Sequence, residues 1–231
     1  MGMTVHHRDQ ALVLRRIPFR ETSLVIHFFT RQRGVLTAMA RGIRSRKQPD
    51  RAALAGFHSL TIFTQARSSQ AMSTLRGAEI DRGRNRLPSL PLAASVAQLM
   101  LEIVYRFFPI GDPHPEYFDA FEEIFDLLER DQPPFSVLAY GQGLALQALG
   151  YGWRMDSCAG CQHNQEIAYF SIRRGQVVCA SCGAAYAHRL HKLSENMAKA
   201  MEQLEWPGGY DLLSKSERKR LYEIGRASLL Q

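Results

Sequence analysis

The four cysteines of the chain form two pairs with the spacing of metal ligands. The first pair is Cys158 and Cys161, the second is Cys179 and Cys182, and 17 residues separate the pairs. Two thiolates on one tight turn can bind one side of an ion, and two such turns about 15 to 20 residues apart complete a tetrahedral zinc site. Because four sulfur ligands leave no position for a water molecule, the pattern predicts one structural Zn²⁺ and no catalytic metal.

Other interpretations of the cysteines stay open at this point. They could form disulfides, or one pair could be a redox motif, although no strand-helix-strand unit of the kind that carries such motifs precedes Cys158. A His-x2-His pair, His188 and His191, could also supply ligands in place of one cysteine pair.

The elements that position the cysteines follow a strongly basic N-terminal part. Residues 1–86 contain 16 Lys or Arg against 5 Asp or Glu, a net charge of +11, whereas residues 87–231 contain 13 against 17, a net charge of −4. Such an asymmetry is typical of a nucleic-acid-binding domain joined to a body with a different role.

The densest positive charge lies in residues 41–51, which we expect to form an irregular loop whose long side chains reach phosphates. With basic residues on neighbouring elements, the predicted DNA-binding set is Arg31, Arg33, Arg41, Arg44, Arg46, Lys47, Arg51 and Arg76. Aromatic residues lie between these charges and could stack on bases, but a small barrel also needs them in its core, so we assign no stacking residue. They are Phe19, Phe28, Phe29, Phe57 and Phe63.

Apolar, β-branched and aromatic runs predict five short strands in the first 80 residues, and therefore a small barrel or sandwich. They lie at 11–14, 22–30, 35–40, 60–64 and 72–80. Residues 81–91 break every period and are interpreted as a linker. A helical period follows, with helices expected near 92–108, 117–128 and 135–149 and others opening at Ser194 and Ser214.

The predicted fold class is therefore α+β with several domains. We expect a barrel at 1–80, a linker at 81–91, a helical domain at 92–153 and 193–231, and a cysteine module inserted at 154–192. Residues 1–10 contain no apolar run of a secretory signal, and the uncharged stretch 132–153 is rich in Gly and Pro, so we expect a buried helix and no membrane association. These features favour a cytoplasmic protein.

Motifs of known catalytic chemistry do not occur in the sequence. There is no phosphate-binding Gly-x4-Gly-Lys-Ser/Thr loop, no Gly-x-Ser-x-Gly elbow and no acidic group spaced to bind Mg²⁺. We therefore expect a binding protein without enzymatic activity or a small-molecule substrate. The alternatives are a metal-dependent nuclease with an unrecognised acidic site and an adaptor that binds only proteins.

Three segments resemble the bacterial RecO family of recombination mediators. They are Arg15-Arg-Ile-Pro-Phe-Arg-Glu-Thr-Ser-Leu24, continuing through Phe29, Thr30 and Gly34 to Ala40-Arg-Gly-Ile-Arg44, then Leu149-Gly-Tyr-Gly152 and Cys158-Ala-Gly-Cys161. The resemblance implies an N-terminal OB-fold barrel and a helical domain with a zinc-finger-like insertion. Its basic surface corresponds best to Arg41, Arg44, Arg46 and Lys47.

The function implied by this resemblance is DNA repair by recombination without catalysis. Such a protein would bind single- and double-stranded DNA, anneal complementary strands and, with RecR, help to load RecA onto strands coated by single-stranded DNA-binding protein. Its expected partners are DNA, RecR and the C-terminal tail of single-stranded DNA-binding protein, with RecA reached indirectly. Its expected place is the cytoplasm, at the nucleoid.

Overall fold

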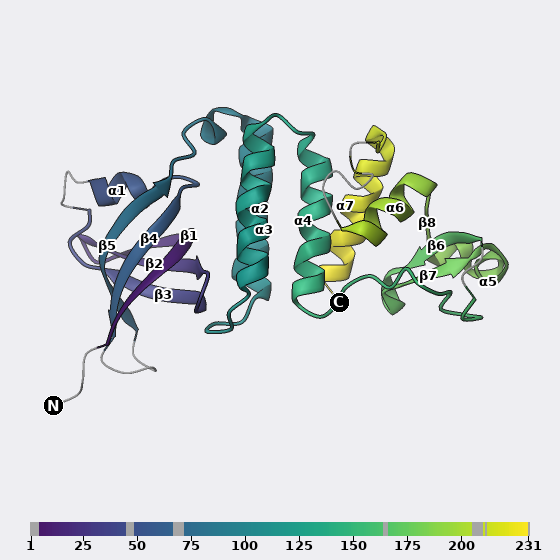
Figure 1. The fold of residues 1–231 in the computed structure, drawn as a ribbon, viewed down its shortest axis with the longest axis horizontal. Coiled ribbons are helices and arrows are strands. Elements are labelled where there is room, and N and C mark those ends of the chain that lie inside the picture. The colour runs from purple at the N-terminus through teal and green to yellow at the C-terminus, as the bar shows by residue number, and fades with distance from the viewer. Residues whose placement is uncertain are drawn as a thin grey trace. The chain divides into compact units, whose positions relative to one another are not determined.

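The structure, a computed structural model, describes residues 5–44, 49–66, 72–163, 166–204, 210 and 212–230. It comprises two compact units, Met1–Asp131 and Gln132–Gln231. The first contains a barrel followed by two long helices, and the second contains helices and a small sheet (Figure 1). The predicted α+β class with an N-terminal barrel is confirmed.

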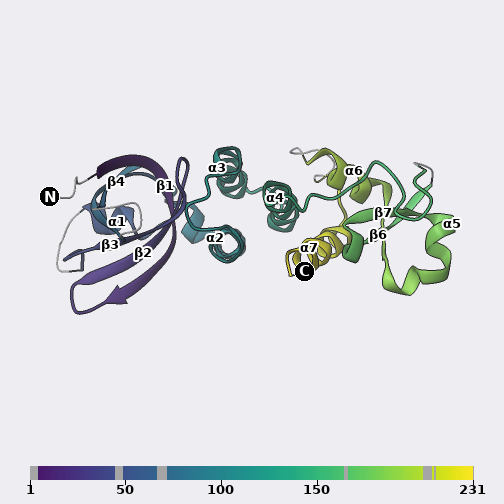
Figure 2. The ribbon, with the colours of Figure 1, turned by 90° about the horizontal axis from the view of Figure 1, so that it is seen from below.

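Five strands form the closed barrel, in the order β1-β2-β3-β5-β4. They are β1 (Val5–Phe19), β2 (Ser23–Thr30), β3 (Gly34–Ala40), β4 (Ser59–Ala66) and β5 (Ser73–Arg82). Neighbouring strands are antiparallel except β3 and β5, which are parallel. A short helix, α1 (Pro49–Ala53), connects β3 to β4, and Figure 2 shows it lying over the ring of strands. This arrangement is OB-like.

Side chains that alternate along the strands fill the barrel. Val13, Ile26 and Phe28 point inward, and Ala53 and Leu54 at the end of α1 belong to the same core. β1 pairs with β4 from Val5 to Ala11 and with β2 from Ala11 to Phe19, and a shift in register between Val13 and Arg15 lies within the second pairing. Such bulges bend a strand, which here lets one long strand take part in two sides of a closed barrel.

The helices α2 (Pro91–Phe107) and α3 (Pro115–Glu129) belong to the same unit as the barrel. Phe29 points outward from β2 and is nevertheless fully buried, because an aromatic cluster covers it. The rings of this cluster are Phe108, Tyr117, Phe118 and Phe121, all with centroids between 5.4 and 6.2 Å from that of Phe29.

The connection between α2 and α3 contacts the barrel at the start of β3. Gly34 has a positive φ of 63°, and a Cβ there would lie 2.0 Å from the carbonyl oxygen of Asp112. The Gly111 N–H donates to the Val35 carbonyl at 3.0 Å. Only glycine permits this approach of two backbones, so Gly34 ties the helical connection to the barrel.

The segment that we interpreted as a linker, 81–91, contains the end of β5, a short helix η1 (Leu87–Ser89) and one fully buried arginine. Arg84 donates hydrogen bonds to the Glu122 carboxylate at 2.6 Å and to the Ser59 hydroxyl at 2.5 Å. Its guanidinium also lies over the Phe125 ring, 5.1 Å from the centroid. The segment therefore joins β5 to α3 through buried contacts.

In the second unit, α4 (Pro134–Ala148) packs against α7 (Lys215–Leu229), with α6 (Glu195–Gln203) beside it. α4 is buried on nearly all sides, as its apolar composition predicts. Gly225 allows close packing, because a Cβ there would lie 2.6 Å from the side-chain oxygen of Gln142. No helix in the described parts of the chain is long and apolar enough to cross a membrane.

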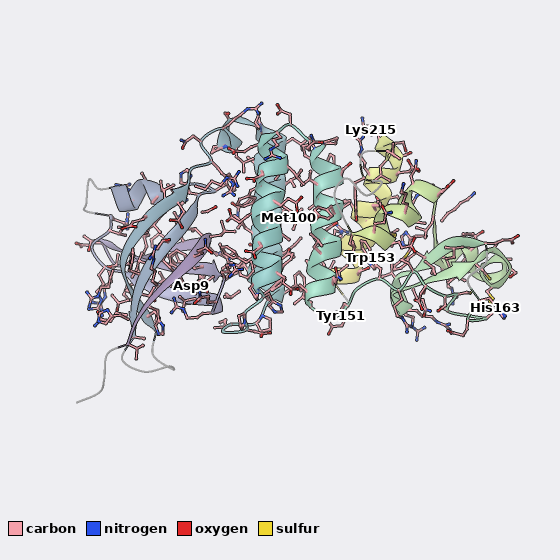
Figure 3. All side chains as sticks on the ribbon, viewed as in Figure 1. Asp9, Met100, Tyr151, Trp153, His163 and Lys215 are labelled. Carbon is pink, nitrogen blue, oxygen red and sulfur yellow. The ribbon has the colours of Figure 1, made fainter. Side chains whose placement is uncertain are left out.

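A three-stranded sheet in the order β7-β6-β8 follows α4. Its strands are β6 (Ile167–Ser171), β7 (Gln176–Cys179) and β8 (His191–Lys192), with the short helices η2 (Ile172–Arg174), α5 (Ala180–Gly183) and η3 (Ala184–Arg189) between them. Trp153, labelled in Figure 3, connects this sheet to α7. The centroid of its ring lies 6.2 Å from that of Phe170, and its indole N–H donates to the Ser228 hydroxyl.

Candidate metal centre and nucleic-acid interface

The four cysteines converge on one point, as predicted. The sulfur atoms of Cys158, Cys161, Cys179 and Cys182 all lie within 4.8 Å of one another, and all four thiols are free. A tetrahedral zinc site with Zn–S bonds of about 2.3 Å separates its sulfurs by about 3.8 Å. The Cys161 and Cys179 sulfurs are 3.8 Å apart. The donor set and its spacing therefore fit a zinc ion.

Backbone hydrogen bonds position the two cysteine turns. The first turn is attached to β7 because the Ala159 N–H donates to the Val177 carbonyl at 2.8 Å, and the second begins where β7 passes into α5. Gly160 is required in the first turn, since a Cβ there would lie 2.9 Å from the Cys182 sulfur. Arg174 also donates to the Ala159 carbonyl at 2.7 Å.

One thiol on each turn has a lowered pKa, Cys158 in the first turn and Cys179, beside the Ser181 hydroxyl, in the second. Burial acts to raise the pKa of the Cys158 thiol, but N–H groups of Cys179, Cys161 and Gly160 outweigh it and lower the pKa to about 6. Hydrogen bonds with Cys179 and Cys161 instead raise the pKa of Cys182 to about 12. Four adjacent negative sulfurs repel one another, so a divalent cation would allow all of them to ionise.

The histidines that could have replaced a cysteine pair lie outside this cluster. His188 is exposed in η3, and His191 pairs with Phe170 across the sheet. Within the described ranges, the cysteines form the one group with metal-ligand geometry. A four-cysteine site is thus the arrangement that the structure supports.

The predicted DNA-binding arginines divide between two regions of the barrel. At the β2–β3 turn, Arg31 forms a bidentate ion pair with Asp119 of α3, with both N···O distances 2.8 Å. Arg33 pairs with the buried Asp9 at 3.2 Å and donates to the Thr64 hydroxyl at 3.1 Å. Both arginines at this turn, Arg31 and Arg33, are therefore already paired with carboxylates.

The acidic partners of this region come largely from α3. Residues 87–131 contain 2 basic and 9 acidic residues, a net charge of −7, whereas residues 132–231 contain 11 and 8, a net charge of +3. Arg82 pairs with Asp126 at 2.7 Å, adding to the pairs made by Arg31 and Arg84. The acidic charge of the helical body is thus concentrated where it neutralises one part of the barrel.

The remaining arginines of the set lie away from these carboxylates. Arg41, Arg44 and Arg51 are exposed, and no ion pair involves them within the part of the chain that the structure describes. Arg76, near the start of β5, is exposed and donates to the Gln65 amide oxygen at 2.5 Å. Arg46 and Lys47 lie outside the described residues.

Hydrogen bonds join the loop after β3 to the β1–β2 turn. The Arg44 N–H donates to the Thr22 carbonyl at 2.9 Å, and the Arg44 guanidinium to the Arg20 carbonyl at 3.4 Å. These bonds bring Arg44 to the turn that contains Arg20, and Arg41 lies in the same turn as Arg44, at residues 41–44. We name these three exposed arginines the turn cluster.

Comparison with known proteins agrees with this arrangement. The family profile "Recombination protein O N terminal" matches residues 3–84, and "Recombination protein O C terminal" matches residues 90–227, beginning at α2. The chain belongs to the RecO family. The resemblance to this family that three segments of the sequence show is therefore confirmed.

Curated relatives of the RecO family resemble the chain along most of its length. The DNA repair protein RecO of Rhizobium etli (strain CFN 42) is 29% identical over 183 residues, which cover 79% of this chain and 70% of the relative. That of Geobacter metallireducens is 28% identical over 180 residues, covering 76% and 72%. That of Gluconacetobacter diazotrophicus is 27% identical over 188 residues, covering 79% and 73%.

Two features of the RecO barrel were not assigned from the sequence. Of the aromatic residues considered for stacking, Phe28 and Phe29 are fully buried and Phe57 and Phe63 are half-buried, but Phe19 is 40% exposed. Arg20 beside it was likewise left out of the predicted DNA-binding set. The sequence signal for both is the apolar triplet Ile17-Pro-Phe19 at the end of β1. Arg15 and Arg16 precede this triplet, and Arg20 follows it.

Proposed function

We propose that the chain is a recombination mediator that acts by binding. It binds single- and double-stranded DNA and anneals complementary strands. With RecR, it helps to load RecA onto strands coated by single-stranded DNA-binding protein, whose C-terminal tail it contacts. It works in the cytoplasm at the nucleoid and has no catalytic activity of its own. Membership of the RecO family, among whose relatives are DNA repair proteins, supports this proposal.

The proposal rests on one observation, which is that carboxylates pair with some arginines of the barrel and not with others. Carboxylates pair with Arg31, Arg33, Arg82 and Arg84, but the turn cluster and Arg51 have no acidic partner among the described residues. Arg41 and Arg44 lie in a turn after β3, whereas Arg51 lies in α1 and not in the irregular loop expected for residues 41–51. Exposed arginines without a carboxylate partner contact phosphates readily, and each contact releases counterions from the nucleic acid. We therefore propose Arg41, Arg44, Arg46, Lys47, Arg51 and Arg76 as phosphate contacts, and a structural role for Arg31 and Arg33.

The metal would have a structural role in this protein. One Zn²⁺ held by Cys158, Cys161, Cys179 and Cys182 would cross-link the first cysteine turn to the end of β7 and the start of α5. Such closed sites contribute folding free energy and do not activate water. The zinc module would therefore hold the sheet in shape while the barrel contacts DNA.

The test combines strand annealing with the salt dependence of binding. We expect the double variant Arg41→Ala/Arg51→Ala to anneal complementary strands more slowly in the presence of single-stranded DNA-binding protein. Its plot of log affinity for a single-stranded oligonucleotide against log salt should be shallower by about 0.7 per lost contact. Arg44 is left intact, because it also holds the β1–β2 turn.

Arg31→Ala is the matched control, since it removes the same charge from the same barrel where Asp119 already occupies the guanidinium. We expect it to keep the wild-type slope. An unchanged slope in the double variant would contradict the proposed contacts. Mg²⁺-dependent cleavage of the DNA would instead favour an enzyme, and the absence of DNA binding at low salt would favour a protein-binding adaptor.

A further inference from the structure

The outer face of β1, β2 and β3 carries an apolar strip that ends at the β1–β2 turn. Ile17 is paired with Val25, and Val25 is paired with Met39. Residues directly opposite one another on paired strands project from the same face. Phe19, paired with Ser23, lies on this face one row nearer the turn. The intervening rows point inward, because Leu24 and Ile26 belong to the barrel core.

Helix α2 covers this outer face only in part. One row farther from the turn than Ile17, the ring of Tyr105 contacts His27 at 5.0 Å, and the Arg15 guanidinium lies 5.4 Å from the centroid of the same ring. Nearer the turn, Ile17 is 38% exposed and Phe19 is 40% exposed. The uncovered part of the face is therefore apolar, and exposed apolar groups gathered within polar surroundings indicate a binding site.

The turn cluster supplies positive charge beside this apolar strip. The Arg20 guanidinium lies over one face of the Phe19 ring, 5.4 Å from its centroid, and the residue stays 40% exposed. Arg41 directly follows Ala40, the partner of Leu24, and Arg44 is bonded to the turn itself. An exposed aromatic ring next to aliphatic side chains, with arginines at its edge, suits a ligand that has flat apolar rings on a negatively charged chain.

Among nucleic acids, only unpaired bases expose the ring faces that such a strip could contact, because the bases of a duplex are stacked on one another. We propose that the exposed ring of Phe19 stacks on an unpaired base of single-stranded DNA. In this arrangement Ile17 provides the adjoining apolar contact, and the turn cluster contacts the phosphates. This inference rests on the proposed DNA-binding function of the barrel. It adds a contact specific to single strands, which the arginines alone do not provide.

The test uses the full-length protein with a fluorescent oligothymidine and a blunt duplex of the same length, each titrated at several salt concentrations. We expect Phe19→Ala to bind the single strand about 5- to 100-fold more weakly, the range for losing one base–aromatic stack. Its salt slope should match wild type, because no charge is removed. Affinity for the duplex should not change. Phe19→Trp, which keeps an aromatic ring, should restore single-strand affinity.

Phe135→Ala is the matched control, because Phe135 is 44% exposed but lies in α4. We expect it to bind both ligands as wild type does. Phe19→Leu keeps apolar bulk without an aromatic ring, so it tests the inference even if the alanine variant fails to fold.

Two outcomes would overturn the stacking contact while leaving the proposed function intact. One is wild-type single-strand affinity in folded Phe19→Ala or Phe19→Leu, and the other is an equal loss of single-strand and duplex affinity. A wild-type protein that binds neither ligand at low salt would instead refute the proposed function.

Discussion

Individual arginines of the barrel unit differ mainly in their burial and in whether a carboxylate is paired with them. Arg84 is completely buried and bonded to Glu122, Arg31 is partly exposed and paired with Asp119, and Arg41 is exposed. The partners lie 38 and 88 residues away in sequence, so composition alone could not separate these cases. Burial decides the energetic weight of each pair, since a buried charge that loses its partner cannot be solvated.

Loss of the buried Arg84 charge should greatly reduce the stability of the barrel unit. We expect Arg84→Met to lower the free energy of unfolding by about 3–5 kcal/mol, because it leaves the partly buried carboxylate of Glu122 unpaired and Asp126 with Arg82 alone. Urea unfolding followed by circular dichroism measures the change.

Arg82→Met is the control for this prediction. It removes a half-exposed arginine from the same Asp126 and should cost about 0–1 kcal/mol. Equal losses in the two variants would mean that the burial of Arg84 contributes little.

Most long elements could be predicted from periodicity, and most short ones could not. Helices such as α2 and α3 have apolar stripes that identify them, and capping-box residues marked the start of α7. The first half of β1 is polar and becomes a strand by pairing with β4. The strands β6, β7 and β8 are short and lie in a module whose core contains the cysteines, so local pattern gave no signal for them.

The two candidate sites differ in the same way, because one depends on residues close in sequence and the other on contacts between distant elements. The cysteine cluster was predictable because its four members are close in sequence and form two Cys-x2-Cys pairs. Which arginines stay unpaired depends on α3, and which phenylalanine stays exposed depends on α2 and the register of β1. Both are consequences of tertiary packing.

The helices α6 and α7 share one carboxylate at their N-termini, which predicts a pH dependence. Glu217 accepts hydrogen bonds from the Ser194 hydroxyl and from the Ser214 N–H, and these lower its pKa below the ordinary glutamate range. A depressed carboxyl pKa contributes stability above the ordinary value and loses it as the pH falls through the lower folded-state pKa.

We therefore expect Glu217→Gln to lower stability at pH 7 by about 1 kcal/mol, the scale of a helix cap. The difference from wild type should disappear at a pH below the folded-state pKa of Glu217. Thermal unfolding between pH 7 and pH 3 measures it. Glu223→Gln changes an exposed carboxylate of the same helix and should not reproduce this profile; a difference that persists unchanged in acid would contradict the role of the ionised carboxylate.

For the molecule as a whole, two compact units and one four-cysteine cluster, with the proposed zinc, predict separable responses to chelation. The two tryptophans of the sequence, Trp153 and Trp206, both fall within residues 132–231, so tryptophan fluorescence reports on this part of the chain and not on the barrel. We expect a strong chelator, or Cys158→Ser, to lower the midpoint of the fluorescence-detected unfolding transition, because metal binding contributes to folding. Binding of single strands by the barrel should remain.

Ser181→Ala serves as the control for metal removal, since its hydroxyl lies 3.2 Å from the Cys179 sulfur but is not one of the clustered ligands. We expect it to retain one equivalent of zinc. Fluorescence unfolding that is indifferent to chelation would contradict a structural metal.

If Phe19 stacks on a base as proposed, the cover that α2 places over the outer barrel face also limits how many bases of a strand the apolar strip can contact. From Phe19 to Arg15, where Tyr105 closes the face, β1 advances by four residues, or about 13 Å at about 3.3 Å per residue. That length accommodates only a few nucleotides. A short footprint leaves neighbouring bases free to find their complements, so a bound strand would stay available for pairing while the protein holds it.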